Sequence, residues 1–173
     1  VKTRNFFSYT GGEAFTQAAA AVESGSNYIY IAGSGQPCSY AAYYVAKYDA
    51  GGNFLKAATD SSVNINFGVC SVPSTGGSSA SGIATLNGNV YLAGNSNWAF
   101  EGDNYGRATI WKYDANLNLV GRWKVPDHWG QFNAIAATGA NLYAVGYATN
   151  QGAANSDDYL VVKYYETGTL LWK

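Results

Sequence analysis

One short segment gathers aromatic and acidic side chains that could bind a ligand. It carries Trp98, Phe100, Glu101, Asp103 and Tyr105, and Trp129 follows further along. Aromatic faces pack against the C–H groups of sugars, and carboxylates are hard oxygen ligands for Ca²⁺. We therefore predict a ligand-binding site formed by Trp98, Glu101, Asp103, Tyr105 and Trp129. The alternative is a loop that only packs its own aromatic side chains.

Metal binding has weaker support. Asp157 and Asp158 could offer oxygen ligands to Ca²⁺, but they lack the D-x-D-x-D-G spacing of a recognised calcium loop. Cys38, Cys70 and the single His128 lack the spacing that zinc requires. We expect no metal site, with Asp157 and Asp158 as weak calcium candidates. We expect Cys38 and Cys70 to form a disulfide between two long loops, the alternatives being buried or free thiols.

Catalytic signatures are absent from the sequence. It contains no G-x-S-x-G, no P-loop and no G-x-G-x-x-G, and one histidine leaves few options for acid–base chemistry. Glu101 with Asp157 or Asp158 could act on a glycoside, where the distance between the two carboxyl groups decides the mechanism. We predict that the chain is not an enzyme and has no cofactor and no catalytic residue.

The elements that position these residues follow from an internal repeat. Three segments match in order, at Tyr28–Gly33, Asn89–Gly94 and Asn141–Gly146. Each is followed by a lysine-containing block, at residues 44–49, 109–114 and 160–165, and then by a turn and an apolar segment, at 52–55, 118–123 and 168–172. A run of small residues precedes each copy, at 18–22, 81–84 and 133–136. Each copy therefore contains four short apolar segments.

These segments have the character of β-strands. They alternate with period two between Gly, Asn and Ser turns, and none shows an apolar stripe of helical spacing and length. A repeat of about 50 residues with four antiparallel strands is typical of a propeller blade. The sequence predicts an all-β fold with three four-stranded blades at about 11–60, 61–127 and 128–173 in a single domain. Residues 1–10 are expected to be the last strand of a preceding blade.

The blocks resemble the bacterial and archaeal β-propeller repeat often called SBBP. Blades of that family carry a G-N-x-Y-V-x-G strand, a K-Y-D strand and a G-N-x-L-W strand, matched here by Asn89–Gly94, Lys112–Asp114 and Gly168–Trp172. The resemblance covers nearly the whole chain and implies a scaffold that hosts many functions. Two departures are Tyr165 in place of Asp and Leu55-Lys56 in place of Leu-Trp.

Three blades are too few for a closed ring, because propellers have about four to eight. The open faces would be an aggregation liability. We expect the ring to be completed either by missing sequence of a longer chain or by association of copies, and the sequence does not choose between them.

Loop lengths separate scaffold from candidate site. Short uniform turns lie at one end of the blades, and long, different loops lie at the other, where binding usually resides. Features repeated in every blade are better explained as scaffold. We expect Lys47, Lys112 and Lys163 to be exposed, Asp49 and Asp114 to bond the following turn, and the repeated tyrosines to pack between blades, at Tyr30, Tyr91 and Tyr143.

Composition narrows the function. Charged residues are 12% of the chain and the net charge is −1, so a nucleic-acid binder or a polybasic membrane-surface protein is excluded. No apolar run reaches the roughly 18 residues of a membrane span. We predict a non-catalytic extracellular or cell-surface structural protein that mediates assembly. The alternatives are a carbohydrate-binding module using the long-loop face, or a fragment of a propeller glycosidase or lyase.

Overall fold

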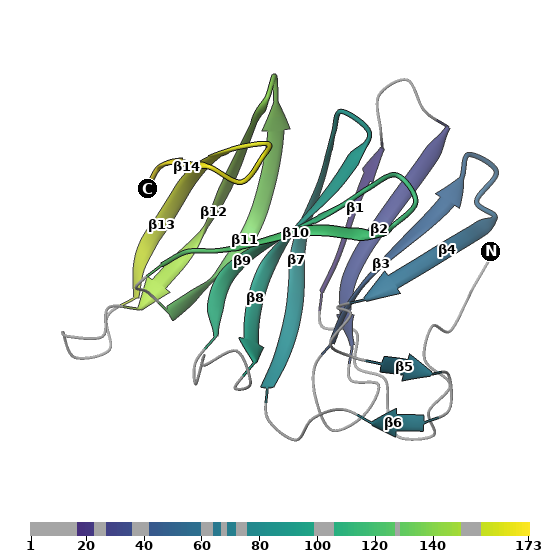
Figure 1. Cartoon of the computed structure of the whole chain (residues 1–173), viewed down its shortest axis with the longest axis horizontal. Helices are drawn as coiled ribbons and strands as arrows, with labels where there is room; N and C mark the ends of the chain where they lie inside the picture. The colour runs from purple at the N-terminus through teal and green to yellow at the C-terminus, as the bar shows by residue number, and fades with distance from the viewer. Residues whose placement is uncertain are drawn as a thin grey trace.

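The computed structural model describes residues 17–22, 27–35, 42–59, 64–66, 69–71, 76–98, 106–126, 129–149 and 157–173. Within these ranges every regular element is a β-strand (Figure 1). The predicted preceding strand at residues 1–10 lies outside the described residues. The prediction of an all-β chain with three four-stranded antiparallel units is confirmed, and the three sheets do not close into a ring.

Each sheet is an antiparallel meander of four consecutive strands. Sheet I contains β1 (Gln17–Val22), β2 (Tyr28–Gly35), β3 (Ala42–Asp49) and β4 (Phe54–Thr59). Sheet II contains β7 (Gly76–Leu86), β8 (Asn89–Trp98), β9 (Arg107–Tyr113) and β10 (Leu119–Lys124). Sheet III contains β11 (Trp129–Thr138), β12 (Asn141–Thr149), β13 (Asp157–Tyr165) and β14 (Leu170–Trp172). A separate hairpin, β5 (Asn64–Asn66) and β6 (Val69–Ser71), lies in the stretch predicted as a long loop.

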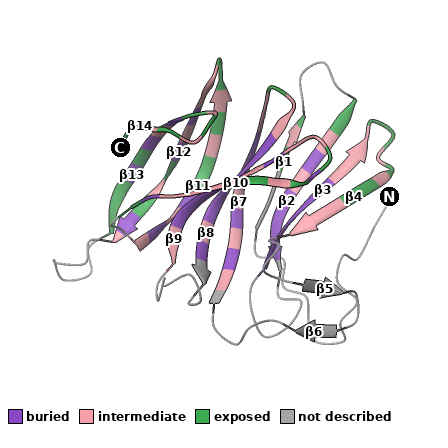
Figure 2. Cartoon of the chain, viewed as in Figure 1, coloured by how far each residue is buried: buried purple, intermediate pink, exposed green. Residues whose placement is uncertain are grey.

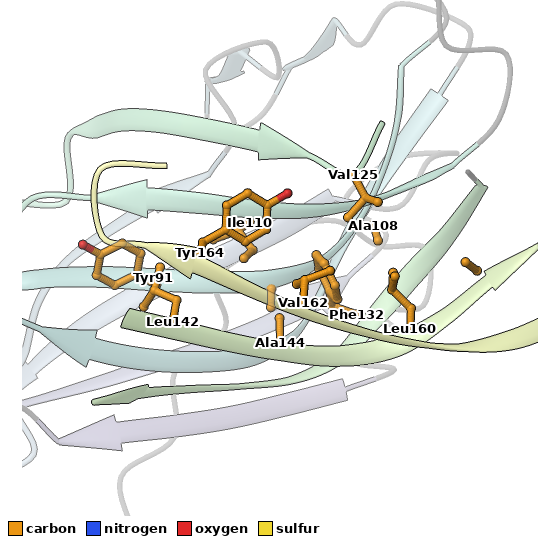
Figure 3. Close-up of a cluster of buried hydrophobic side chains, with 12 residues drawn as sticks. Tyr91, Ala108, Ile110, Val125, Phe132, Leu142, Ala144, Leu160, Val162 and Tyr164 are labelled. Atoms are coloured by element: carbon orange, nitrogen blue, oxygen red, sulfur yellow. The ribbon is translucent and has the colours of Figure 1, made fainter. Parts of the chain in front are cut away.

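Sheet II is packed on both faces, and this explains its apolar sequence. Alternate residues of β8 face opposite neighbours: Val90 and Leu92 belong to the cluster shared with sheet I, while Tyr91 and Ala93 belong to the cluster shared with sheet III. The cluster between sheets II and III is drawn in Figure 3. A sheet covered on both faces needs apolar residues at consecutive positions, as β8 and β9 show (Figure 2).

A glycine recurs in the second strands, at Gly94 and Gly146, where the backbone of the neighbouring strand comes very close. A bulge inserts one extra residue in the neighbouring strand, Ser81 opposite β8 and Asn133 opposite β12. At these points a Cβ on Gly94 or Gly146 would lie 1.8 Å from a carbonyl oxygen of the neighbouring strand. Only glycine fits there.

The turns between the third and fourth strands share one hydrogen-bond pattern. Asp49 N–H donates to the carbonyl of Asn53 at 3.0 Å, and the Asn53 amide and side chain both donate to the Asp49 carboxylate. Asp114 and Asn118 repeat these bonds, as predicted. The Asn118 N–H groups hold the pKa of Asp114 below its ordinary value, because they stabilise the ionised carboxylate.

The same turn needs one residue with positive φ, and the three sheets fill it differently. Gly52 and Gly168 occupy it in sheets I and III, with φ of 73° and 101°, whereas Leu117 occupies it in sheet II with φ of 57°. Leucine is costly in this left-handed region. Its side chain is buried in the cluster between sheets I and II, and this burial offsets the backbone cost.

Substitutions at Leu117 separate these two effects. Leu117→Ala loses the buried side chain but keeps the strained backbone, whereas Leu117→Gly loses the side chain and relieves the strain. We expect the glycine variant to be the more stable of the two by about 1 kcal/mol, measured by urea unfolding.

Leu119 provides the matched control, because it packs against the same cluster from within β10. There the order is expected to reverse, with Leu119→Gly less stable than Leu119→Ala, since Leu119 has no positive φ for glycine to relieve and glycine loses more backbone entropy on folding. If Leu117→Gly is also less stable than Leu117→Ala, the left-handed backbone at Leu117 carries no cost that packing has to offset.

Candidate functional site

The strand ends that are connected by residues 36–41, 99–105 and 150–156, the predicted long loops, lie at one common end of the three sheets (Figure 1). Near this end Ser34 of β2 receives a hydrogen bond from the Ala80 amide of β7 at 2.8 Å. The Asn95 side chain of β8 likewise donates to the carbonyl of Gly130 in β11 at 2.6 Å. These bonds tie the loop-bearing ends of sheets I, II and III together.

Two residues of the predicted ligand site, Trp98 and Trp129, lie at this end. Glu101, Asp103 and Tyr105 lie outside the described residues. Trp98, expected in a loop, is the last residue of β8 and pairs with Gly76. Trp129, also expected in a loop, is the first residue of β11 and is partly buried. Both strands are longer than the apolar sequence pattern indicated, because the hydrogen bonds between neighbouring backbones continue through polar and small residues. Sugar binding remains a prediction.

The acidic pair also lies in a strand rather than a loop. Asp157 and Asp158 begin β13, and the Thr149 hydroxyl donates to Asp157 Oδ1 at 2.6 Å across the ladder. Consecutive strand residues point to opposite faces, so the two carboxylates are not brought together. Among the described residues, no three His, Cys, Asp or Glu side chains gather as a metal site requires.

The predicted disulfide remains a prediction. Cys38 lies outside the described residues. Cys70 is on β6, opposite Ile65, and the structure does not describe its side chain.

The repeated lysines are where the sequence prediction was wrong. Lys47 and Lys112 are not exposed blade residues but half-buried contacts between sheets. Lys47 Nζ donates to the carbonyl of Ala115, in the third turn of sheet II, at 2.8 Å. Lys112 Nζ donates to the carbonyl of Glu166, in the corresponding turn of sheet III, at 3.2 Å. Each lysine thus holds the tight turn of the following sheet.

A tyrosine accompanies each lysine. The Lys47 ammonium lies 5.7 Å from the ring centroid of Tyr30, and that of Lys112 lies 5.6 Å from the centroid of Tyr91. Burial, together with the Glu166 carboxylate, raises the pKa of Tyr91 to about 12, so its hydroxyl stays protonated. That hydroxyl donates to the same Glu166 carbonyl at 3.4 Å. The predicted inter-sheet packing is confirmed for Tyr30 and Tyr91, whereas Tyr143 belongs to neither inter-sheet cluster.

Sheet III carries the same tyrosine and lysine on its outer face, which no other sheet of the described residues covers (Figure 2). Tyr143 and Lys163 occupy the positions of Tyr91 and Lys112, with the ammonium 5.5 Å from the ring centroid. Within the described part of the chain, Lys163 Nζ has no hydrogen bond comparable to those of Lys47 and Lys112. The missing contact distinguishes the third lysine from the other two.

Apolar side chains surround Lys163 on this open face. Val145 and Val161 are 43% and 44% exposed, whereas Ala93 and Ile110 at the equivalent positions of sheet II are buried. Tyr159 and Trp172 are exposed on the same sheet. Sequence reasoning predicted open sheet faces but did not identify these residues, although the repeat alignment contains the signal. We call Tyr143, Val145, Val161, Lys163 and Trp172 the open face of sheet III.

Comparisons with known proteins add no family. No family model matches the chain, and no curated protein matches it. In the described residues there is also no helix that could cross a membrane.

The same substitution at two equivalent lysines tests the inter-sheet contact. Lys112→Met keeps the apolar stem but removes the bond to Glu166, and should lower the free energy of unfolding by about 1–3 kcal/mol. Lys163→Met should change it by less than about 0.5 kcal/mol in the monomeric chain. Urea unfolding of both variants at low protein concentration measures the difference. Equal effects at the two positions would show that the inter-sheet bond contributes nothing.

Proposed function

We propose that the chain is a non-catalytic, extracellular β-propeller building block that assembles through protein–protein contacts. One observation carries this proposal: the open face of sheet III exposes side chains at positions that are buried between sheets elsewhere in the chain. Val161 is 44% exposed, while Val45 and Ile110 at the same repeat position are fully buried. An exposed surface with the apolar side chains of a protein interior is expected to be covered by a partner in the functional protein.

The stacking of the sheets supports the same conclusion. In an array of repeats each unit buries its apolar face against its neighbours, and an end unit needs either a polar outer face or a partner. Sheet III has an apolar outer face, with Val145, Val161 and Trp172 exposed. An apolar outer face of this kind is better covered than exposed to solvent, and a partner protein would cover it.

Composition is compatible with close contact between copies. The net charge is −1 over 173 residues, so electrostatic repulsion between copies is weak. Low charge combined with abundant Gly and Tyr, at 21 and 15 residues, is typical of β-rich surface proteins and supports an extracellular location.

Mass measured against concentration tests the proposal. We expect native mass spectrometry and sedimentation equilibrium to show reversible association. Replacing Val145 and Val161 together by Thr should weaken it about tenfold or more, because two hydroxyls enter an apolar contact.

Val120→Thr is the matched control. Val120 is 55% exposed on β10 of sheet II, away from the open face, so this variant should associate like the natural chain. A chain that stays monomeric at every concentration would contradict the proposed function.

A further inference from the structure

We propose that the interface between sheets I and II holds an internal water molecule, bound by the hydroxyl groups of Ser78 and Ser96. Both sheets lie within the chain, so this site does not depend on the proposed assembly. Between sheets II and III the equivalent place is taken by a side chain of the protein itself, that of Asn95.

Buried hydroxyl groups gather at the loop-bearing end of this interface. Among the described residues, the buried polar side chains are Ser34, Ser78, Ser96 and Thr109. In its strand, each of them is an even number of residues from a member of the cluster between sheets I and II. Because alternate strand residues share a face, all four hydroxyls point into that interface.

Two of these hydroxyls have protein partners and two do not. Ser34 Oγ accepts from the Ala80 amide at 2.8 Å, and the Thr109 hydroxyl donates to a backbone carbonyl two residues before it at 2.8 Å. Within the described residues, neither Ser78 Oγ nor Ser96 Oγ has a hydrogen-bond partner. The two serines pair directly across β7 and β8, so their Cβ atoms are about 5 Å apart and one small molecule can reach both. A buried hydroxyl without a partner is destabilising, which favours such an occupant.

The interface between sheets II and III carries a different group at this place. There the Asn95 side chain donates to the carbonyl of Gly130 at 2.6 Å. In the repeat alignment Ser34 occupies the position of Asn95, and Ser78 occupies that of Gly130. Serine is shorter than asparagine, and Ser34 bonds the Ala80 amide instead. The carboxamide of Asn95 therefore has no equivalent between sheets I and II, where the two hydroxyls without partners lie.

The chemistry of the site favours water over an ion. A hydroxyl group can both donate and accept, and buried waters typically bond about three polar groups that are otherwise unsatisfied. Arg107 lies directly opposite Ser96, on the same face of sheet II, and its positive charge disfavours a metal cation. A water offers both donors and acceptors, as a carboxamide does, so it replaces the group that Asn95 supplies in the other interface.

Oxygen-17 relaxation dispersion of the solvent measures long-lived internal water directly. It detects the water oxygen and is insensitive to the exchange of hydroxyl protons. Ser34→Asn restores the group that Asn95 supplies, and it should remove the contribution of a single internal water from the dispersion of the natural chain. Ala148→Ser is the matched control, because it places a hydroxyl at the position of Ser96 in sheet III, where Asn95 is already present. This variant should leave the dispersion unchanged.

Two alanine variants test the shared occupant through stability. Ser78→Ala and Ser96→Ala each remove one hydrogen bond to the water, and each should raise the equilibrium constant for unfolding about fivefold, measured with urea. Because both hydroxyls bind the same water, the double variant should lose little more than either single variant. These variants also decide the matter if Ser34→Asn does not fold.

The other outcomes overturn the proposal. Alanine variants more stable than the natural chain would mean that the hydroxyls are buried without any partner. Fully additive losses would mean that the two hydroxyls do not share an occupant. An unchanged dispersion in folded Ser34→Asn would mean that no water occupies the site. If chloride stabilises the natural chain but not Ser96→Ala, the occupant is chloride beside Arg107 rather than water.

Discussion

The fold depends on one contact repeated between neighbouring sheets, in which a lysine of one sheet holds the tight turn of the next. Lys47 and Lys112 make this contact, and the Tyr91 hydroxyl joins the second one. A hydrogen bond from a charged lysine to a half-buried carbonyl fixes the relative position of two sheets, which their apolar faces alone would not define. Hydrophobic burial supplies most of the stability, but it is not directional. The lysine contacts set the register of the stack.

The two interfaces fill the same space with different side chains. In the interface between sheets II and III, Trp123 lies against the turn, and a Cβ on Gly168 would be 2.2 Å from its ring nitrogen. In the interface between sheets I and II, the small Ala58 occupies the position of Trp123, and Leu117 occupies that of Gly168. A large residue on one side is matched by a small one on the other, as close packing of interiors requires. Leu117 accepts a left-handed backbone to fill the volume that a tryptophan fills elsewhere.

The strands were predictable from the repeat, because Tyr, Gly and Lys recur at fixed positions in it. The turns at Asp49 and Asp114 were predictable because their hydrogen bonds join residues close together in the sequence. The role of the lysines was not predictable, since Lys47 and Ala115 are far apart in sequence and a lysine in a strand is usually solvated. Strand ends were missed where polar residues continue the backbone ladder, as at Ser78 and Ser96, which pair in register and are buried. For the candidate ligand site, the sequence placed Trp98 and Trp129 at the loop-bearing end of the sheets, but it placed them in loops, whereas the structure has both in strands.

A sheet in this chain is stabilised by having a neighbour on each face, and native-state hydrogen exchange measures this most directly. At concentrations where the chain is monomeric, the amides of β8 and β9 should exchange only through global unfolding, and those of β13 and β14 should exchange faster through local opening. The β13 and β14 amides should slow toward the β8 and β9 values as the protein concentration rises. Equal protection of both sets in the monomer, or no dependence on concentration, would contradict the account.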